Sequence, residues 1–206
     1  MTDSLIDRVP VIPVVVLHDV AHAVPVAEAL VDGGVPVIEL TLRTPAALRC
    51  IEQIATHVPD ILVGAGTVIA PEQAKDAVSA GAQFLVSPGT TDALAGAMQD
   101  TRLPHLPGAA TVSEVLRLLG LGYSEMKFFP AEASGGINFL KAIGAPVPQA
   151  RFCPTGGITA SNAASYLSLP NVGCVGGSWL TPADALRDND WAQITRLASD
   201  STHQLA

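Results

Sequence analysis

Lys127 is the residue best suited to covalent chemistry in this sequence. The chain has only three lysines, and the other two, Lys75 and Lys141, lie in segments with helical spacing, where an exposed amine is ordinary. Lys127 lies instead in a short apolar run, 125–130, that predicts a buried strand. Burial disfavours the ammonium form of a lysine, and the free amine can attack a ketone to give a carbinolamine and then a Schiff base. A purely structural ion pair is the alternative, but burying a charge without a function is costly.

The segment 38–43, which predicts another strand, supplies polar partners for such an amine. Side chains alternate between the two faces of a strand, so Glu39, Thr41 and Arg43 share one face and the aliphatic residues between them share the other. Glu39 is a candidate general acid and base, and the planar guanidinium of Arg43 is a candidate anchor for a carboxylate. An internal Glu–Arg ion pair without chemistry is the alternative. The presence of Lys127 favours the catalytic interpretation.

Two glycine-rich segments, 153–158 and 175–179, follow the last two predicted strands. Loops in these positions commonly bind phosphate in (β/α)8 barrels, because glycine lets backbone N–H groups approach the anion. Tight turns also require glycine, so each segment alone is weak support and the pair is stronger. Thr67 and Pro88 lie at the ends of two other predicted strands, where each could be an ordinary turn residue.

The histidines and cysteines predict neither a metal site nor a cofactor. The five histidines are scattered and show no HxH or HExxH spacing. Cys50, Cys153 and Cys174 are odd in number and far apart, so they fit neither a disulfide framework nor a CxxC zinc site. A reduced, cytoplasmic compartment is the simplest interpretation.

Short apolar runs alternate with alanine-rich segments of helical spacing along the whole chain. Such alternation is typical of an α/β fold with parallel strands covered by helices. We therefore expect residues 1–206 to form one domain, a single (β/α)8 TIM barrel. A doubly wound open sheet would be expected to carry a glycine-rich turn after its first strand, and this sequence has none there. The eight predicted strands lie in the runs 11–17, 36–42, 61–67, 84–89, 105–110, 125–130, 151–157 and 172–180.

The charge of the chain and the length of its apolar stretches argue against two kinds of partner, a nucleic acid and a membrane. The formal net charge is −8 and no cluster of Lys and Arg occurs, so a nucleic acid partner is not expected. The longest apolar stretch, Val9 to Leu17, is too short to span a membrane, and the N-terminal residues show no secretory signal.

The motifs KFFPAEASGG and FCPTGGI are specific enough to indicate a family. Together with IELTLRTPAAL, VGAGTV, FLVSPG, LPGAAT and VGGSWLTPADAL, they closely resemble the 2-keto-3-deoxy-6-phosphogluconate (KDPG) aldolases, whose family also contains 4-hydroxy-2-oxoglutarate aldolases. The resemblance extends from about residue 9 to the end of the chain. It implies a class I aldolase of Entner–Doudoroff-type catabolism that reversibly cleaves KDPG to pyruvate and D-glyceraldehyde 3-phosphate. Cleavage of 4-hydroxy-2-oxoglutarate to pyruvate and glyoxylate is implied as a further activity.

The resemblance also assigns roles to individual positions. It implies that Lys127 forms the Schiff base and that Glu39 is the general acid and base. It implies a homotrimer and a small phosphorylated keto acid as substrate. The remaining positions match groups that bind the carboxylate of the pyruvate half (Arg43 and Thr67), shape the pocket (Pro88 and Phe129) or bind the phosphate (Thr155, Gly156, Gly157, Gly177 and Ser178).

Two other classes of protein remain alternatives at this point. An isomerase or epimerase on a phosphate-binding barrel uses similar glycine-rich loops but forms no imine, so borohydride with pyruvate would leave no adduct on it. A sugar-phosphate-binding protein without catalysis would have no use for a buried amine that faces a carboxylate. Within the aldolases, the sequence leaves open 4-hydroxy-2-oxoglutarate or the C4-epimeric sugar acid as the preferred substrate.

Overall fold

The computed structural model describes residues 4–205, in which parallel strands alternate with helices. The strands are β1 (Val11–Val15), β2 (Val37–Thr41), β3 (Leu62–Gly66), β4 (Phe84–Val86), β5 (His105–Leu106), β6 (Gly108–Ala109), β7 (Glu125–Phe128), β8 (Arg151–Pro154) and β9 (Val175–Gly177). The α-helices are α1 (Ala23–Asp32), α2 (Ala47–His57), α3 (Pro71–Ser79), α4 (Asp92–Asp100), α5 (Val112–Gly120), α6 (Gly136–Gly144), α7 (Ala163–Leu167), α8 (Ala183–Asp188) and α9 (Trp191–Leu205). Three 3-10 turns are η1 (Leu5–Asp7), η2 (Val20–His22) and η3 (Glu132–Ser134). Each predicted run contains one strand, except the fifth, which contains two.

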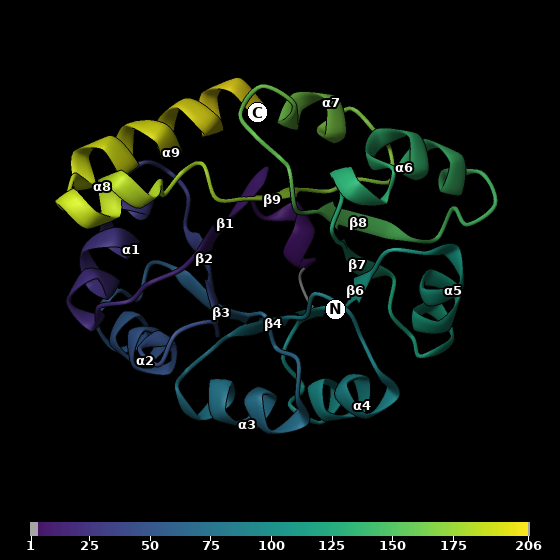
Figure 1. The fold of residues 1–206 in the computed structure, drawn as a ribbon, viewed down its shortest axis with the longest axis horizontal. Coiled ribbons are helices and arrows are strands. Elements are labelled where there is room, and N and C mark those ends of the chain that lie inside the picture. Colours follow the sequence, from purple (N-terminus) through teal and green to yellow (C-terminus); the bar gives the residue numbers. More distant parts are fainter. Residues whose placement is uncertain (1–3, 206) are drawn as a thin grey trace.

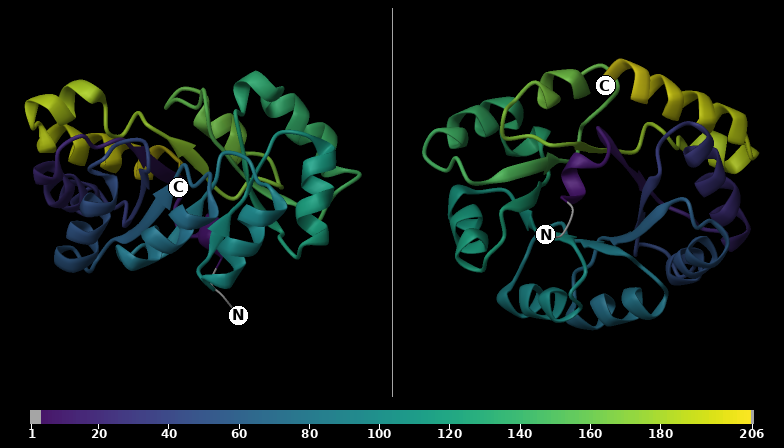
Figure 2. Two further views of the ribbon diagram at one scale, coloured as in Figure 1. Left: turned by 60° about the horizontal axis from the view of Figure 1, so that its bottom comes forward. Right: turned by 180° about the vertical axis from the view of Figure 1, so that it is seen from behind.

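The strands do not form the closed eight-stranded barrel that the sequence predicted. Within residues 4–205 they make two hydrogen-bonded sheets, one of six strands in the order β5-β4-β3-β2-β1-β9 and one of three in the order β6-β7-β8. The prediction of a closed (β/α)8 barrel is therefore wrong. The molecule is an α/β fold whose two parallel sheets lie around a common centre, with the helices outside them (Figures 1 and 2).

The first interruption of the ladder lies between β5 and β6, where Pro107 separates two strands that the sequence predicted as one. Proline has no N–H group and cannot donate to a ladder. Side chains bridge the gap instead. The Gly108 N–H donates to Ser87 Oγ at 3.2 Å, and Thr90 Oγ1 donates to the Gly108 carbonyl at 3.2 Å. Hydroxyl groups from the segment after β4 thus hold β6 in place.

The second interruption lies between β8 and β9. Two isolated bridges, Phe152–Val172 and Thr155–Gly176, take the place of a continuous ladder. Between these bridges the chain advances one residue further on the β9 side than on the β8 side. An extra residue on one strand leaves part of the backbone unpaired, as it does in a β-bulge. The two sheets therefore meet here without regular pairing.

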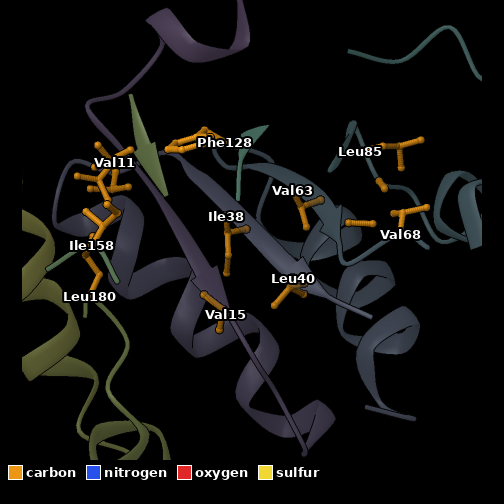
Figure 3. Packing of buried hydrophobic residues seen from close by; sticks show 14 of the residues in the cluster. Val11, Val15, Ile38, Leu40, Val63, Val68, Leu85, Phe128, Ile158 and Leu180 are labelled. Atoms are coloured by element: carbon orange, nitrogen blue, oxygen red, sulfur yellow. The ribbon is translucent and has the colours of Figure 1, made fainter. Parts of the chain in front are cut away.

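Two buried clusters divide the interior. The larger lies between the strands and the helices and includes Ile38, Leu40 and Phe128 (Figure 3). The smaller is formed mainly by residues of the strands and of η1, and it includes Val37 and Leu5. The larger is called the outer cluster below and the smaller the inner cluster. Strand residues that contact the helices thus alternate with residues that face the centre.

This alternation confirms the predicted orientation of two strands. Ile38 and Leu40 of β2 pack in the outer cluster while Val37 packs in the inner one, so Glu39, two residues after Val37, faces the centre. Met126 and Phe128 of β7 also pack in the outer cluster, and Lys127 between them faces inward.

Local signals fix where several helices begin. Pro71 occupies the first turn of α3, where its missing N–H has no intrahelical partner to lose. The Thr111 hydroxyl accepts from the Glu114 N–H at 3.3 Å, and Glu114 accepts from the Thr111 N–H at 2.9 Å, a capping box that starts α5. In residues 4–205, no helix is both long and apolar enough to cross a lipid bilayer.

We expect Ser87→Ala to destabilise the fold by about 1–3 kcal/mol, because the buried Gly108 N–H would lose its acceptor. The free energy of unfolding in urea measures this effect. Ser168→Ala is the matched control, because it removes an exposed hydroxyl that donates to the Ser165 carbonyl, and we expect a change within about 0.5 kcal/mol. Equal stability of the two variants would contradict a bridging role for Ser87.

Candidate active site

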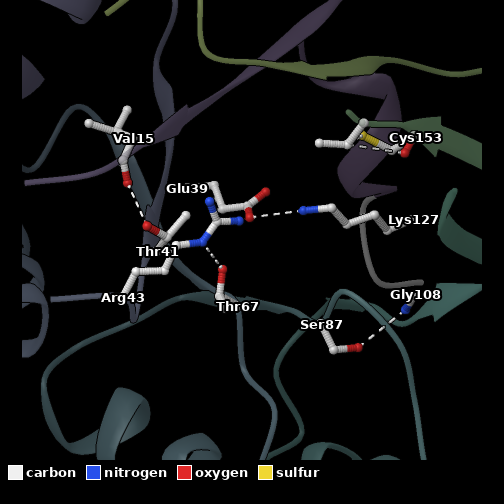
Figure 4. Close-up of polar contacts among 10 residues, drawn as sticks. Val15, Glu39, Thr41, Arg43, Thr67, Ser87, Gly108, Lys127 and Cys153 are labelled. Atoms are coloured by element: carbon white, nitrogen blue, oxygen red, sulfur yellow. Dashed lines mark hydrogen bonds and ion pairs between the residues drawn. The ribbon is translucent and has the colours of Figure 1, made fainter. Parts of the chain in front are cut away.

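A buried ion pair lies at the centre of the molecule. Lys127 Nζ on β7 donates to Glu39 Oε1 on β2 at 3.1 Å, and each side chain is only 3% exposed (Figure 4). The positions are 88 residues apart in the sequence, and their strands belong to different sheets. An amine and a carboxylate at this distance can exchange a proton directly. The predicted nucleophile and the predicted acid–base group are therefore brought together.

Gly66 at the end of β3 makes room for the Glu39 carboxylate. A Cβ atom added to Gly66 would lie 2.6 Å from Glu39 Cδ and 2.6 Å from Cγ, closer than real Cβ contacts. Gly66 is the register partner of Thr41 on β2, so its backbone passes directly beside this side chain. This role of Gly66 could not be predicted from a glycine at a strand end, because it depends on a distance between two strands.

Arg43 and Thr67 meet at the rim of the centre. Arg43 Nε donates to Thr67 Oγ1 at 3.0 Å, and Figure 4 shows the guanidinium directed toward the centre near Glu39. Arg43 is exposed and lies in the turn after β2, because the strand ends at Thr41. Strand alternation thus does not extend to Arg43, although its side chain still joins the site. The bond to Thr67 uses Nε, so the terminal nitrogens can bind a carboxylate.

Phe129 lies beside the lysine, and Pro88 lies beside β6, the strand that pairs with β7. The Lys127 amine lies 5.5 Å from the centroid of the Phe129 ring, and this ring is partly buried. Gly108, the register partner of Lys127, lies so close to Pro88 that an added Cβ would overlap the Pro88 backbone. Both residues predicted to shape the pocket therefore border the strands that carry the amine.

The loop after β8 lies beside the same centre. Thr155 is buried, and its backbone N–H donates to the Phe128 carbonyl at 2.9 Å, which ties the loop to β7. Gly156 and Gly157 have φ angles of 99° and 80°, in the left-handed region that favours glycine. Successive backbone N–H groups in a turn can form a concave site for an anion.

The segment at the end of β9 lies next to the loop after β8, because Thr155 and Gly176 form an isolated bridge. Gly177 is buried, and an added side chain there would overlap the Trp179 ring, while Ser178 is exposed. Ser178 lines a groove of about 660 Å³ that also contacts Val14, the register partner of Glu39 on β1. Thr181 lines this groove too, and its hydroxyl is buried without a hydrogen-bond partner among the described residues. The contact of Val14 with this groove was not predicted, because in the sequence Val14 looks like an ordinary strand residue.

Within residues 4–205, no group of three or more His, Cys, Asp and Glu side chains is placed to hold a metal ion. The chemically capable groups at the centre are the amine, the carboxylate and the guanidinium. A buried lysine that contacts a carboxylate, with anion-binding loops at the same ends of parallel strands, is typical of an enzyme that forms a Schiff base.

The family model described as KDPG and KHG aldolase matches residues 2–197. The chain therefore belongs to the KDPG and KHG aldolase family, where KHG is 4-hydroxy-2-oxoglutarate.

Individual relatives are similar over nearly their whole length. The chain is 53% identical to a 2-dehydro-3-deoxy-phosphogluconate aldolase from Pseudoalteromonas atlantica over 192 residues, which are 93% of this chain and 89% of the relative. It superimposes with a TM-score of 0.94 on a KDPG aldolase from Legionella pneumophila, solved with pyruvate as a covalent carbinolamine, at 50% identity and 96% coverage of each chain. A Zymomonas mobilis KDPG aldolase, solved with 3-phosphoglycerate, gives a TM-score of 0.92 at 46% identity, with 97% and 94% coverage.

We expect Gly66→Ala to lower kcat by about 10- to 100-fold, because the new methyl group would displace the Glu39 carboxylate from the amine. Steady-state pyruvate release measures kcat. Gly96→Ala in α4 is the matched control, since an added Cβ there has no heavy atom within 4 Å, and we expect its kcat to be unchanged. A Gly66→Ala enzyme with full kcat would show that the carboxylate needs no such clearance.

Proposed function

We propose that this chain is a class I aldolase that reversibly cleaves KDPG to pyruvate and D-glyceraldehyde 3-phosphate. The observation that carries the proposal is the buried contact of 3.1 Å between Lys127 Nζ and Glu39 Oε1, in a chain that belongs to the KDPG and KHG aldolase family. The relatives named above are aldolases, and one was captured with pyruvate covalently bound. They give no support to the isomerase or epimerase alternative.

The substrate is bound at both ends in this proposal. Arg43 holds the carboxylate of the pyruvate half through its terminal nitrogens. Thr67 accepts from Arg43 Nε, so its own hydroxyl hydrogen remains able to donate to the same carboxylate. The loop of Thr155, Gly156 and Gly157 binds the phosphate. Gly177 and Ser178 complete that end, while Pro88 and Phe129 shape the pocket between the two.

The reaction begins when Glu39 takes one proton from the Lys127 ammonium and the free amine attacks the C2 ketone. Glu39 is close enough to return that proton to the C2 oxygen and then to carry a second proton from the nitrogen to the same oxygen, which leaves as water. The product is a protonated imine, and its positive nitrogen withdraws electrons from the adjacent C3–C4 bond.

Cleavage then follows from removal of a proton. Glu39, directly or through a water molecule, takes the proton of the C4 hydroxyl, and the C3–C4 bond breaks with its electrons moving toward the imine. D-Glyceraldehyde 3-phosphate leaves, and an enamine of pyruvate remains on Lys127. Protonation of the enamine at C3 and hydrolysis of the imine release pyruvate and restore the amine.

Several further features belong to the same proposal. The family name includes KHG, which supports its cleavage to pyruvate and glyoxylate as a second activity. We infer a homotrimer in the cytoplasm, with residues 1–206 as one domain, because the sequence resembles a family of that kind and its cysteines suit a reduced compartment.

Borohydride reduction in the presence of pyruvate tests the chemistry. We expect a stable adduct that peptide mapping places on Lys127, because reduction of the imine fixes the three carbons of pyruvate to Nζ. We also expect Lys127→Met, which keeps much of the side-chain volume, to form no adduct and to lose activity on the order of 10⁴-fold or more. Lys75→Met and Lys141→Met are matched controls, because both amines are exposed, and both variants should form the adduct normally.

Substrate preference is tested by pyruvate release from KDPG, its C4 epimer and KHG at equal concentrations in EDTA. A clear preference for KDPG supports the full proposal. A preference for KHG would remove the phosphorylated substrate but leave the Lys127 chemistry standing. An adduct mapped to Lys75 or Lys141, or an active Lys127→Met enzyme, would overturn the proposal.

A further inference from the structure

The segment directly after β7 is bound to the loop that carries Thr155, Gly156 and Gly157, here called the phosphate loop. The Ala131 N–H donates to the Thr155 carbonyl at 2.8 Å, and the Glu132 N–H donates to the Gly156 carbonyl at 3.1 Å. Since β7 also carries Lys127, these two bonds act together with the β7–β8 ladder to set the distance between the amine and the phosphate loop. A change in the segment after β7 would therefore alter how a substrate reaches from one to the other.

The side chain of Glu132 packs against the phosphate loop at Gly157. A Cβ atom added to Gly157 would lie 2.5 Å from Glu132 Cγ and 2.7 Å from Glu132 Cβ, so the Gly157 backbone rests on the stem of this glutamate. On its other side, Gly157 receives a hydrogen bond of 3.1 Å at its carbonyl from Asn162 Nδ2. The position of Gly157 thus depends on where the Glu132 side chain is held.

Tyr166 holds that side chain. Its hydroxyl donates to Glu132 Oε1, while its ring is fully buried on α7 within the outer core cluster. Burial, together with the bond to Glu132, raises the pKa of Tyr166 above its usual range, so the hydroxyl stays protonated and remains a donor. Gly136 permits this approach, because an added Cβ there would lie 2.9 Å from the Tyr166 hydroxyl. The contact is built into the packing around α7.

We propose that the Glu132–Tyr166 pair is a positioning pair that fixes the phosphate loop relative to Lys127 and so determines specificity for the phosphorylated end of the substrate. This inference rests on the proposed function. The bond to Tyr166 also keeps a negative carboxylate turned toward α7. Without it, the carboxylate is free to rotate toward the substrate phosphate, where like charges repel. The pair thus acts on the phosphate end of the substrate, through the loop and through the direction of the Glu132 carboxylate.

The test compares two substrates on the same variants. For Tyr166→Phe we expect KM for KDPG to rise about 10- to 150-fold, as loss of a hydrogen bond to a charged group predicts, with kcat within about twofold of wild type. Both constants for KHG, which has no phosphate, should stay unchanged. Glu132→Ala should give the same selective rise, and because Glu132 is exposed this variant tests the idea even where Tyr166→Phe folds poorly.

Two controls separate positioning from general loosening of the fold. Glu132→Gln keeps an oxygen that accepts from Tyr166, so we expect its KM for KDPG to remain close to wild type. Tyr123 precedes β7 in the sequence, and its buried hydroxyl donates to the Ala95 carbonyl at 3.2 Å. We expect Tyr123→Phe, which removes this hydroxyl, to change KM for KDPG and for KHG to the same extent.

The possible failures can be told apart. Equal changes in KM for KDPG and KHG, or no change with Tyr166→Phe and Glu132→Ala, would overturn the positioning role while the aldolase function stands. A wild-type enzyme that prefers KHG to KDPG would overturn the phosphorylated substrate, and this inference with it.

Discussion

The ion pair between Lys127 and Glu39 places two opposite charges 3.1 Å apart where almost no solvent reaches them. Each charge is tolerated in this position because the other is there. Removing one partner of a buried pair typically costs about 3–5 kcal/mol, since the remaining charge is left uncompensated. The pair therefore constrains β2 and β7 together, and a change at either position affects the fold as well as the chemistry.

Close packing around this pair depends on glycines that provide space. Gly66 leaves room for the Glu39 carboxylate, Gly108 for the backbone of Pro88, and Gly176 for the Thr155 hydroxyl. In each case an added methyl group would occupy volume that a neighbouring group already fills. The glycines of the phosphate loop differ, because Gly156 and Gly157 also adopt left-handed backbone angles. Around the ion pair, glycine is thus needed because it leaves space. In the phosphate loop, it is needed because of the backbone angles.

The sequence predicted the orientation of Lys127 and Glu39 better than it predicted the sheet. Strand alternation placed Lys127 and Glu39 on the inner face correctly, because both lie within short strands whose aliphatic neighbours contact the helices. Alternation did not hold for Arg43, which lies beyond the end of β2.

The break in the sheet was not foreseen, because Pro107 lies inside an apolar run that looks like one strand. The support from Tyr166 was missed for another reason: it depends on a contact between residues 34 positions apart, which no local pattern indicates.

The division into two sheets bears on how the reactive distance is maintained. Glu39 belongs to the six-stranded sheet and Lys127 to the three-stranded one. The carboxylate and the amine are therefore held by two sheets whose strands are hydrogen-bonded separately. No ladder hydrogen bond joins β2 to β7 in the described residues. The distance between the carboxylate and the amine therefore depends on how the two sheets pack at the two interruptions, one at Pro107 and one between β8 and β9.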